Sequence, residues 1–182
     1  MAFRFETVYH PEAFTVMAKA LRKTVRKKRS RLSHIFGILM MISALLLTFT
    51  PEFAFDFTTV ITWLVVAAVL VILILEDHIN GYLARKQMMP GLEKAVVTFK
   101  PEGYHSETEI GSSDFHYDKI RLLVETADYL VFVLSQNHAQ VYHKKSITGG
   151  TMEEFRAFIT NVTGKEIQTI ERDRVKANKS VC

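Results

Sequence analysis

The sequence predicts a membrane α+β protein, in which a hairpin of two membrane-spanning helices is joined to a small antiparallel β-sheet or barrel with a C-terminal helix. Two observations predict the hairpin: two long apolar stretches, and a cluster of basic residues in front of the first one. A third predicts the sheet, because short segments of β-forming residues recur after the second stretch and are separated by turns. A chain of 182 residues has room for one modest domain besides the hairpin.

Residues 32–50 and 58–75 contain no Asp, Glu, Lys or Arg, so residues 32–75 form the predicted transmembrane hairpin. At a rise of about 1.5 Å per residue each stretch covers roughly 27–29 Å, close to the hydrocarbon thickness of about 30 Å. The segment between them is too short for a domain, so the two spans are expected to be antiparallel neighbours. A cleaved signal peptide is not expected, because a long charged segment precedes the first stretch.

Eight basic residues with no acid among them lead into the first span: Lys19, Arg22, Lys23, Arg26, Lys27, Lys28, Arg29 and Arg31. By the positive-inside rule they place the N-terminal flank in the cytoplasm, and two crossings return the chain to the same side. The same eight residues are the candidate contacts to anionic lipid. Nucleic acid is not an expected partner, because the basic residues lie beside an apolar block.

Residues 1–31 are predicted to form a strand followed by a basic amphipathic helix. Residues 3–9 alternate apolar and polar side chains, and Pro11 suits the first turn of a helix whose apolar residues recur at helical spacing. Two interpretations of this helix are open: it lies against anionic lipid at the inner leaflet, or it only carries the topology signal into the first span. Whether the strand pairs with the C-terminal sheet is also open.

Residues 92–164 are predicted to form a cytoplasmic β-rich domain, after a helix that continues from the second span to about Met89. The expected strands are 95–99, 104–110, 115–124, 129–135 and 139–143. A helix is expected to begin with a capping box between Thr151 and Glu154 and to stop at Gly164. Residues 165–182 are mostly charged and polar, and a tail without regular structure is expected there.

The sequence contains no recognisable catalytic or metal-binding motif. Cys182 is the only cysteine, so this chain alone forms no disulfide and no cysteine zinc site. His105, His116, His138 and His143 have no metal-binding spacing, and no nucleophile elbow, phosphate loop or dinucleotide fingerprint is present. No metal, cofactor or enzymatic activity is therefore expected.

The layout resembles the bacterial YcxB-like family. The matching segments are the turn at 99–103, residues 117–120, Glu125 with Tyr129, residues 131–133 and the helix start at 151–156. The resemblance implies a two-span protein of the bacterial inner membrane with a pleckstrin-homology-like C-terminal domain and no defined activity. Residues 143–147 depart from it, because the family tends to carry a proline–lysine pair before an aromatic residue there.

These observations predict a membrane-anchored cytoplasmic binding or regulatory module. Its expected partners are the lipid bilayer, anionic lipid, and a protein or peptide of unknown identity. The alternative is a small membrane enzyme or transporter subunit that acts as an oligomer, in which histidines and carboxylates converge in one pocket. A homo-oligomer is compatible with both hypotheses.

Overall fold

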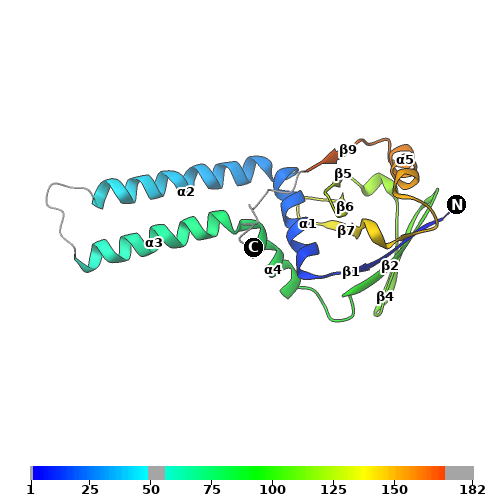
Figure 1. Cartoon of the computed structure of the whole chain (residues 1–182), viewed down its shortest axis with the longest axis horizontal. Helices are drawn as coiled ribbons and strands as arrows, with labels where there is room; N and C mark the ends of the chain where they lie inside the picture. Colours follow the sequence, from blue (N-terminus) through cyan, green and yellow to red (C-terminus); the bar gives the residue numbers. More distant parts are fainter. Residues whose placement is uncertain (1, 49–55, 171–182) are drawn as a thin grey trace, which may run out of the picture.

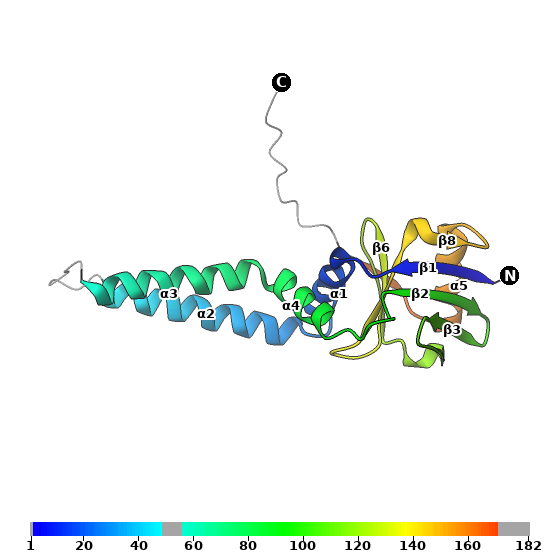
Figure 2. The ribbon, with the colours of Figure 1, turned by 90° about the horizontal axis from the view of Figure 1, so that it is seen from below.

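The computed structural model describes residues 2–48 and 56–170, and has a long helical arm attached to a β-rich body (Figure 1). The arm is formed by α2 (Lys27–Thr48) and α3 (Phe57–Ile74), which run antiparallel and side by side (Figures 1 and 2). Both helices are long and apolar enough to cross a membrane. The apolar stretch of each helix is not buried within the protein. Two antiparallel apolar helices are therefore present where the hairpin was predicted, and their crossing of a membrane stays a prediction. Residues 49 and 50, predicted as the end of the first span, lie outside the described residues.

The two helices of the arm approach each other closely at Gly37. A Cβ atom added there would lie 3.1 Å from the Leu73 Cδ1 atom, tighter than an ordinary contact. At its start α3 is capped by Asp56, whose carboxylate accepts a hydrogen bond of 2.9 Å from the Thr59 N–H. Small-residue packing and a helix cap therefore help to align the hairpin.

The body is built from two sheets. The first has the strand order β4-β3-β2-β1-β8, and the second has the order β7-β6-β5-β9. The strands are β1 (Phe3–Val8), β2 (Lys94–Lys100), β3 (Gly103–Thr108), β4 (Gly111–Phe115), β5 (Leu122–Glu125), β6 (Tyr129–Val133), β7 (Ala139–His143), β8 (Ile147–Thr148) and β9 (Ile167–Thr169). All pairs are antiparallel except β5 with β9. The α+β class is thus confirmed.

The N-terminal strand β1 is an internal strand of the first sheet, which answers the question that the sequence left open. Phe5 pairs with Val97 of β2 on one side and with Ile147 of β8 on the other. The two strands that flank β1 both follow the hairpin in the sequence. The hairpin is therefore an insertion in a single domain. Strand β1 of this domain precedes the hairpin in the sequence, and the other strands follow it.

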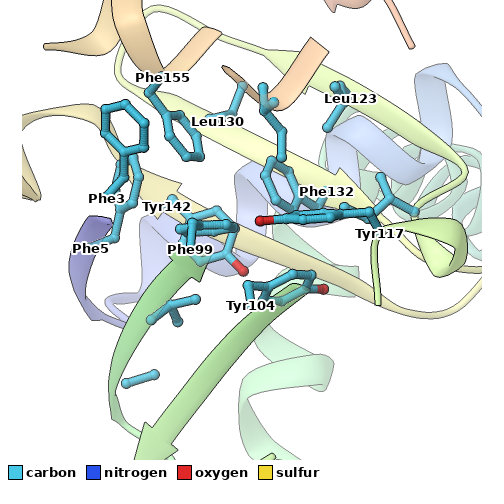
Figure 3. Packing of buried hydrophobic residues seen from close by; sticks show 14 residues of the cluster. Phe3, Phe5, Phe99, Tyr104, Tyr117, Leu123, Leu130, Phe132, Tyr142 and Phe155 are labelled. Atoms are coloured by element: carbon cyan, nitrogen blue, oxygen red, sulfur yellow. The ribbon is translucent and has the colours of Figure 1, made fainter. Parts of the chain in front are cut away.

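Aromatic rings from both ends of the chain form the main core (Figure 3). The ring centroid of Phe155, on helix α5 (Met152–Thr163), lies 4.8 Å from that of Phe5 and 4.9 Å from that of Phe99. Phe5, Phe99 and Phe155 are completely buried. Such a cluster stabilises the domain through buried apolar area and edge-to-face ring contacts.

Helix α1 (Pro11–Lys23) covers the other side of the second sheet. Its residues Ala13, Ala20 and Leu21 pack against Val131 and Val141 in a second apolar cluster. Because β6 has the aromatic core on one face and α1 on the other, all its residues are buried and the strand lacks polar alternation. The apolar face of this amphipathic helix is therefore used by the protein itself.

Helix α4 (Glu76–Lys86) lies against α1 on the side away from the β-sheets (Figures 1 and 2). The contact is tight at Gly81, which is buried. A Cβ atom there would lie 2.8 Å from the backbone nitrogen of Thr15. The layers therefore follow the order sheets, α1, α4, and the hairpin leaves from the α4 side of the body.

Four predictions of local structure differ from what is observed. The basic amphipathic helix and the first span meet at a break at residues 24–26, and α2 begins at Lys27. The helix predicted to run from the second span to about Met89 is interrupted at Leu75 and ends at Lys86. The strand predicted at 115–124 is interrupted by the 3₁₀ turn η1 (Tyr117–Lys119), whose Tyr117 hydroxyl donates to the Lys100 carbonyl over 2.6 Å.

The fourth difference concerns the tail predicted at 165–182. Strand β9 lies within it, and Ile167 pairs with Leu123 at the edge of the second sheet. The expectation of a tail without regular structure is therefore wrong for residues 167–169, because the edge of β5 supplies backbone partners. Residues 171–182 lie outside the described part of the chain.

Candidate functional site

A groove of about 520 Å³ lies where the first helix of the arm, α2, leaves the body. Its walls are the turn between α1 and α2 and the loop between β6 and β7. The lining residues are Thr24, Val25, Arg26, Lys27, Lys28, Arg29, Gln136 and Asn137. Four of these are basic and none is acidic, so the groove favours an anion. We call it the basic groove.

The walls of the basic groove are tied together by Arg26. Its Nε donates to the Gln136 carbonyl over 2.7 Å, and its Nη2 donates to the Asn137 Oδ1 over 2.5 Å. The opposite loop is tightened by Ser135, whose hydroxyl accepts from the Asn137 and His138 N–H groups at 3.2 and 3.1 Å. Two segments 110 residues apart in the sequence are thereby held at a fixed spacing.

The chain turns into the groove because α1 ends at Lys23. Thr24 has φ −111° and ψ −93°, outside the helical region, and its hydroxyl donates to the Ala20 carbonyl over 2.6 Å. Helix α2 then starts at Lys27, so its first turn lines the groove. The Lys27 N–H is already bonded to the Thr24 carbonyl over 3.3 Å, so the attraction for anions comes from the basic side chains together with the partial positive charge at the start of the helix.

The eight candidate lipid contacts fall into three places. Arg26, Lys27, Lys28 and Arg29 line the basic groove, and the last three are exposed. Arg31 is exposed one turn further along α2. Lys19, Arg22 and Lys23 are on α1 and are partly buried. The structure thus brings four of the eight together in the groove, and the other four do not line it.

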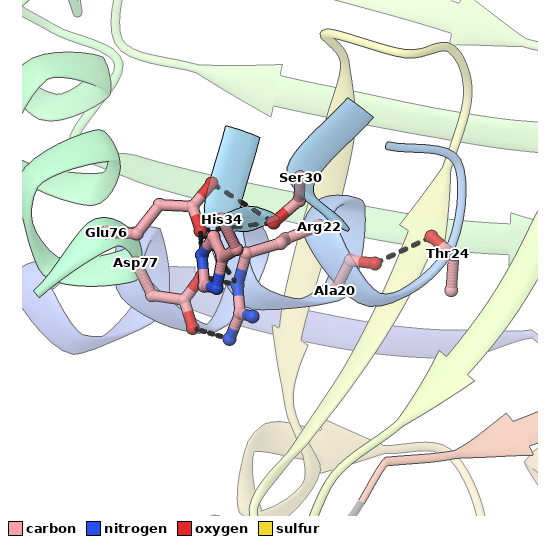
Figure 4. Close-up of polar contacts among 7 residues, drawn as sticks. All are labelled: Ala20, Arg22, Thr24, Ser30, His34, Glu76 and Asp77. Carbon is pink, nitrogen blue, oxygen red and sulfur yellow. Dashed lines mark hydrogen bonds and ion pairs between the residues drawn. The ribbon is translucent and has the colours of Figure 1, made fainter. Parts of the chain in front are cut away.

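Arg22 belongs to an ionic cluster at the base of the hairpin (Figure 4). Its Nε and Nη2 donate to the two carboxylate oxygens of Asp77, each over 2.6 Å. Beside this pair, the Glu76 carboxylate lies 2.8 Å from His34 Nε2 and accepts from the Ser30 hydroxyl over 3.1 Å. These contacts join α1, α2 and α4, so the segment that lines the basic groove and the helices of the arm are connected at the same base.

Glu76 and Asp77 were not among the predicted site residues. The available signal was their position, because two acids directly follow the second apolar stretch and face the basic cluster in front of the first. Residues at the two cytoplasmic ends of a membrane hairpin lie near each other, so opposite charges there are candidates for ion pairs. This signal predicts an ion pair between the acids and the basic cluster, and only the structure shows that Arg22 is the partner.

Two of the four histidines of the body, His105 and His143, have local side-chain contacts. His105 Nδ1 lies 2.6 Å from Asp114 Oδ1 on the neighbouring strand, and His143 Nδ1 accepts from the Lys145 N–H. His116 and His138 are exposed. Among residues 2–48 and 56–170, no group of three or more His, Cys, Asp and Glu side chains is placed to hold a metal ion.

Glu125 joins three elements of the body. Its carboxylate accepts from Arg156 Nη2 over 2.7 Å and from Nε over 3.1 Å, and it forms an ion pair with Lys144 in η2 (Lys144–Ser146). Burial alone would raise the pKa of Glu125, but the hydrogen bonds and charges of these two cations outweigh it and hold the pKa below its ordinary value. This contact fastens β5 to α5 and to the loop before β8.

The fold and the site define an α+β protein with a long apolar helical hairpin and a basic groove at the hairpin's base. Residues 99–159 match the family model described as YcxB-like protein. The match covers the body from the end of β2 into α5, and it confirms the YcxB-like resemblance over this part of the chain. A search of curated proteins finds no match.

Proposed function

We propose that this protein is a membrane-anchored binding module whose basic groove binds the phosphate-bearing headgroups of anionic lipids. The observation that carries the proposal is the position of the groove, since Lys27, Lys28 and Arg29 stand in the first turn of the helix that continues as an apolar span. Charged headgroups lie at this level of a bilayer, next to the ends of spanning helices. Membrane anchoring would then place the groove at the level of its ligand.

The basic cluster also supports an orientation. We propose that the body and both termini lie in the cytoplasm of a bacterium and that the hairpin crosses the inner membrane, because the basic residues flank the near ends of the spans. Each Lys or Arg near an anionic surface contributes about 1 kcal/mol, an attraction that salt screens. Three exposed bases in one groove are enough to prefer anionic over neutral lipid.

The body supports a binding role rather than a chemical one. We propose a pleckstrin-homology-like domain, for which the two sheets and the helix α5 that packs on their aromatic core are the supporting features. A protein or peptide partner of this domain remains a prediction. The alternative of a membrane enzyme or transporter subunit stays a prediction.

Lipid retention by the full chain tests the headgroup proposal. The protein is purified in detergent, mixed with equal amounts of phosphatidylglycerol and phosphatidylcholine, and analysed by native mass spectrometry. We expect the wild type to retain phosphatidylglycerol preferentially. The triple variant Lys27→Gln, Lys28→Gln, Arg29→Gln is expected to lose about tenfold or more of this preference, because it removes three bases from the groove.

A second triple variant serves as the matched control. Lys100→Gln, Lys119→Gln and Lys145→Gln remove the same charge at exposed positions outside the groove. We expect this variant to keep the preference of the wild type. Equal retention of both lipids by the wild type, or the same loss in both variants, would contradict a headgroup site in the groove.

A further inference from the structure

Helix α4 has an apolar stripe that no other described part of the protein covers. Leu75, Ile79, Tyr82 and Leu83 recur at helical spacing and are 41%, 37%, 65% and 48% exposed. The opposite side of the helix is occupied, because Gly81 packs on α1 and Asp77 is paired with Arg22. An exposed stripe of this kind, on a short helix with basic residues in its last turn, is typical of a helix at a membrane surface.

The layers of the body determine where the stripe faces. Helix α1 lies between the second sheet and α4, and it contacts both. The face of α4 opposite α1 therefore points away from the sheets, toward the side from which the hairpin projects (Figures 1 and 2). If the hairpin crosses a bilayer, this is the side on which the bilayer lies.

The stripe is also continuous with the lipid-exposed surface of α3. Val71 and Ile74 near the end of that helix are 50% and 70% exposed, and Leu75 follows directly. At Leu75 the backbone leaves regular helix geometry, with φ −95° and ψ 13°, and α4 turns away from the axis of α3 (Figure 1). The apolar surface of the span thus bends at its end into a surface of α4.

We propose that α4 is an interfacial helix, which lies in the headgroup region of the same bilayer with its apolar stripe toward the acyl chains. The inference rests on the proposed membrane anchoring. Tyr82 suits this depth because its ring is apolar and its hydroxyl is polar, and Arg85 and Lys86 suit contact with phosphate. Because the Arg22–Asp77 pair fixes α4 to α1, an interfacial α4 would also fix the angle of the body against the membrane.

Tryptophan depth measurements on the full chain test this proposal. The protein contains one tryptophan, Trp63 in α3, which reports whether the hairpin is inserted. The variant Trp63→Phe, Tyr82→Trp moves the reporter to the stripe, and Trp63→Phe, Ser112→Trp moves it to an exposed position on β4. Each protein is reconstituted into vesicles of phosphatidylcholine and phosphatidylglycerol that carry bromine at a shallow or a deep position of the acyl chains.

We expect the tryptophan at position 82 to lose most of its emission to shallow bromine and to be protected from aqueous iodide. The tryptophan at position 112 is expected to show the reverse, and Trp63 is expected to be quenched by deep bromine. If Trp63 is quenched but position 82 behaves like position 112, the interfacial helix is wrong and the anchor stands. If no position is quenched by bromine, both the anchor and the interfacial helix are wrong.

Discussion

Replacing Phe5 with alanine is expected to lower the free energy of unfolding of the body by about 3–5 kcal/mol. Phe5 is completely buried, and its ring contacts those of Phe99, Tyr142 and Phe155. The alanine leaves a cavity among these three rings, which all belong to residues that follow the hairpin in the sequence. The variant therefore measures how strongly strand β1 stabilises the rest of the domain, which follows the hairpin in the sequence.

Glu6→Ala is the matched control on the same strand. Glu6 is exposed, and a substitution there is expected to change the unfolding free energy by no more than about 0.5 kcal/mol. Both variants are compared with the wild type by pulse proteolysis of the full chain in detergent over a urea series, which measures cleavage within residues 99–159. Similar losses for Phe5→Ala and Glu6→Ala would contradict the observed register of β1.

The second large effect is expected for Glu125→Gln, which should lower the unfolding free energy by about 2–3 kcal/mol. The substitution keeps the shape of the side chain and removes the charge that Lys144 and Arg156 share. These two cations then lie close together without the negative charge that balances them, because glutamine keeps only one acceptor oxygen and is neutral, and the side chain of Lys144 is only 17% exposed. The same proteolysis assay measures this loss.

The effect of Glu125 is expected to depend on pH in a defined direction. Its pKa is lower in the folded protein than the ordinary value of 4.5. The stabilisation is therefore complete above that ordinary pKa, and it decreases as the pH falls through the lowered pKa of the folded state. The difference between wild type and Glu125→Gln should shrink over the same range.

Glu153→Gln is the control that removes only a surface ion pair of Arg156 and leaves Glu125 in place. Glu153 also accepts from Arg156, over 3.0 Å, but its side chain is 79% exposed. An exposed pair contributes less than about 1 kcal/mol, so this variant should stay close to the wild type at every pH. Equal losses for Glu125→Gln and Glu153→Gln would show that burial of Glu125 has no special effect.

The features that the sequence predicted correctly depend on local patterns. The capping box is observed, with the Thr151 hydroxyl accepting from the Glu154 N–H at 3.2 Å and the Glu154 carboxylate accepting from the Thr151 N–H at 2.7 Å. Gly164 ends the same helix with φ 63°, a conformation that glycine adopts without strain. Pro11 is in the first turn of α1 as predicted. Each signal involves residues within one or two turns of each other.

The features that were missed depend on tertiary contacts. Strand β9 has three residues and no distinctive composition, and it exists because β5 offers a free edge. The break between α1 and α2 has no Gly or Pro, and it is fixed by the Arg26 bonds to a loop far along the chain. The basic residues of the candidate site were predicted because basic side chains attract anionic lipid. Their partners Gln136 and Asn137 could not be predicted, because only the fold brings them close to Arg26.

Labelling of single cysteines in intact cells tests the central claim, that the apolar hairpin crosses the membrane and leaves the split domain on the inner side. In a Cys182→Ser background, Glu52→Cys places the only thiol between the two spans, and Ser112→Cys places it on β4 of the body. A membrane-impermeant maleimide is expected to label position 52 in intact cells and position 112 only after permeabilisation. Labelling of position 112 in intact cells, or recovery of the protein in the soluble fraction without detergent, would contradict the account.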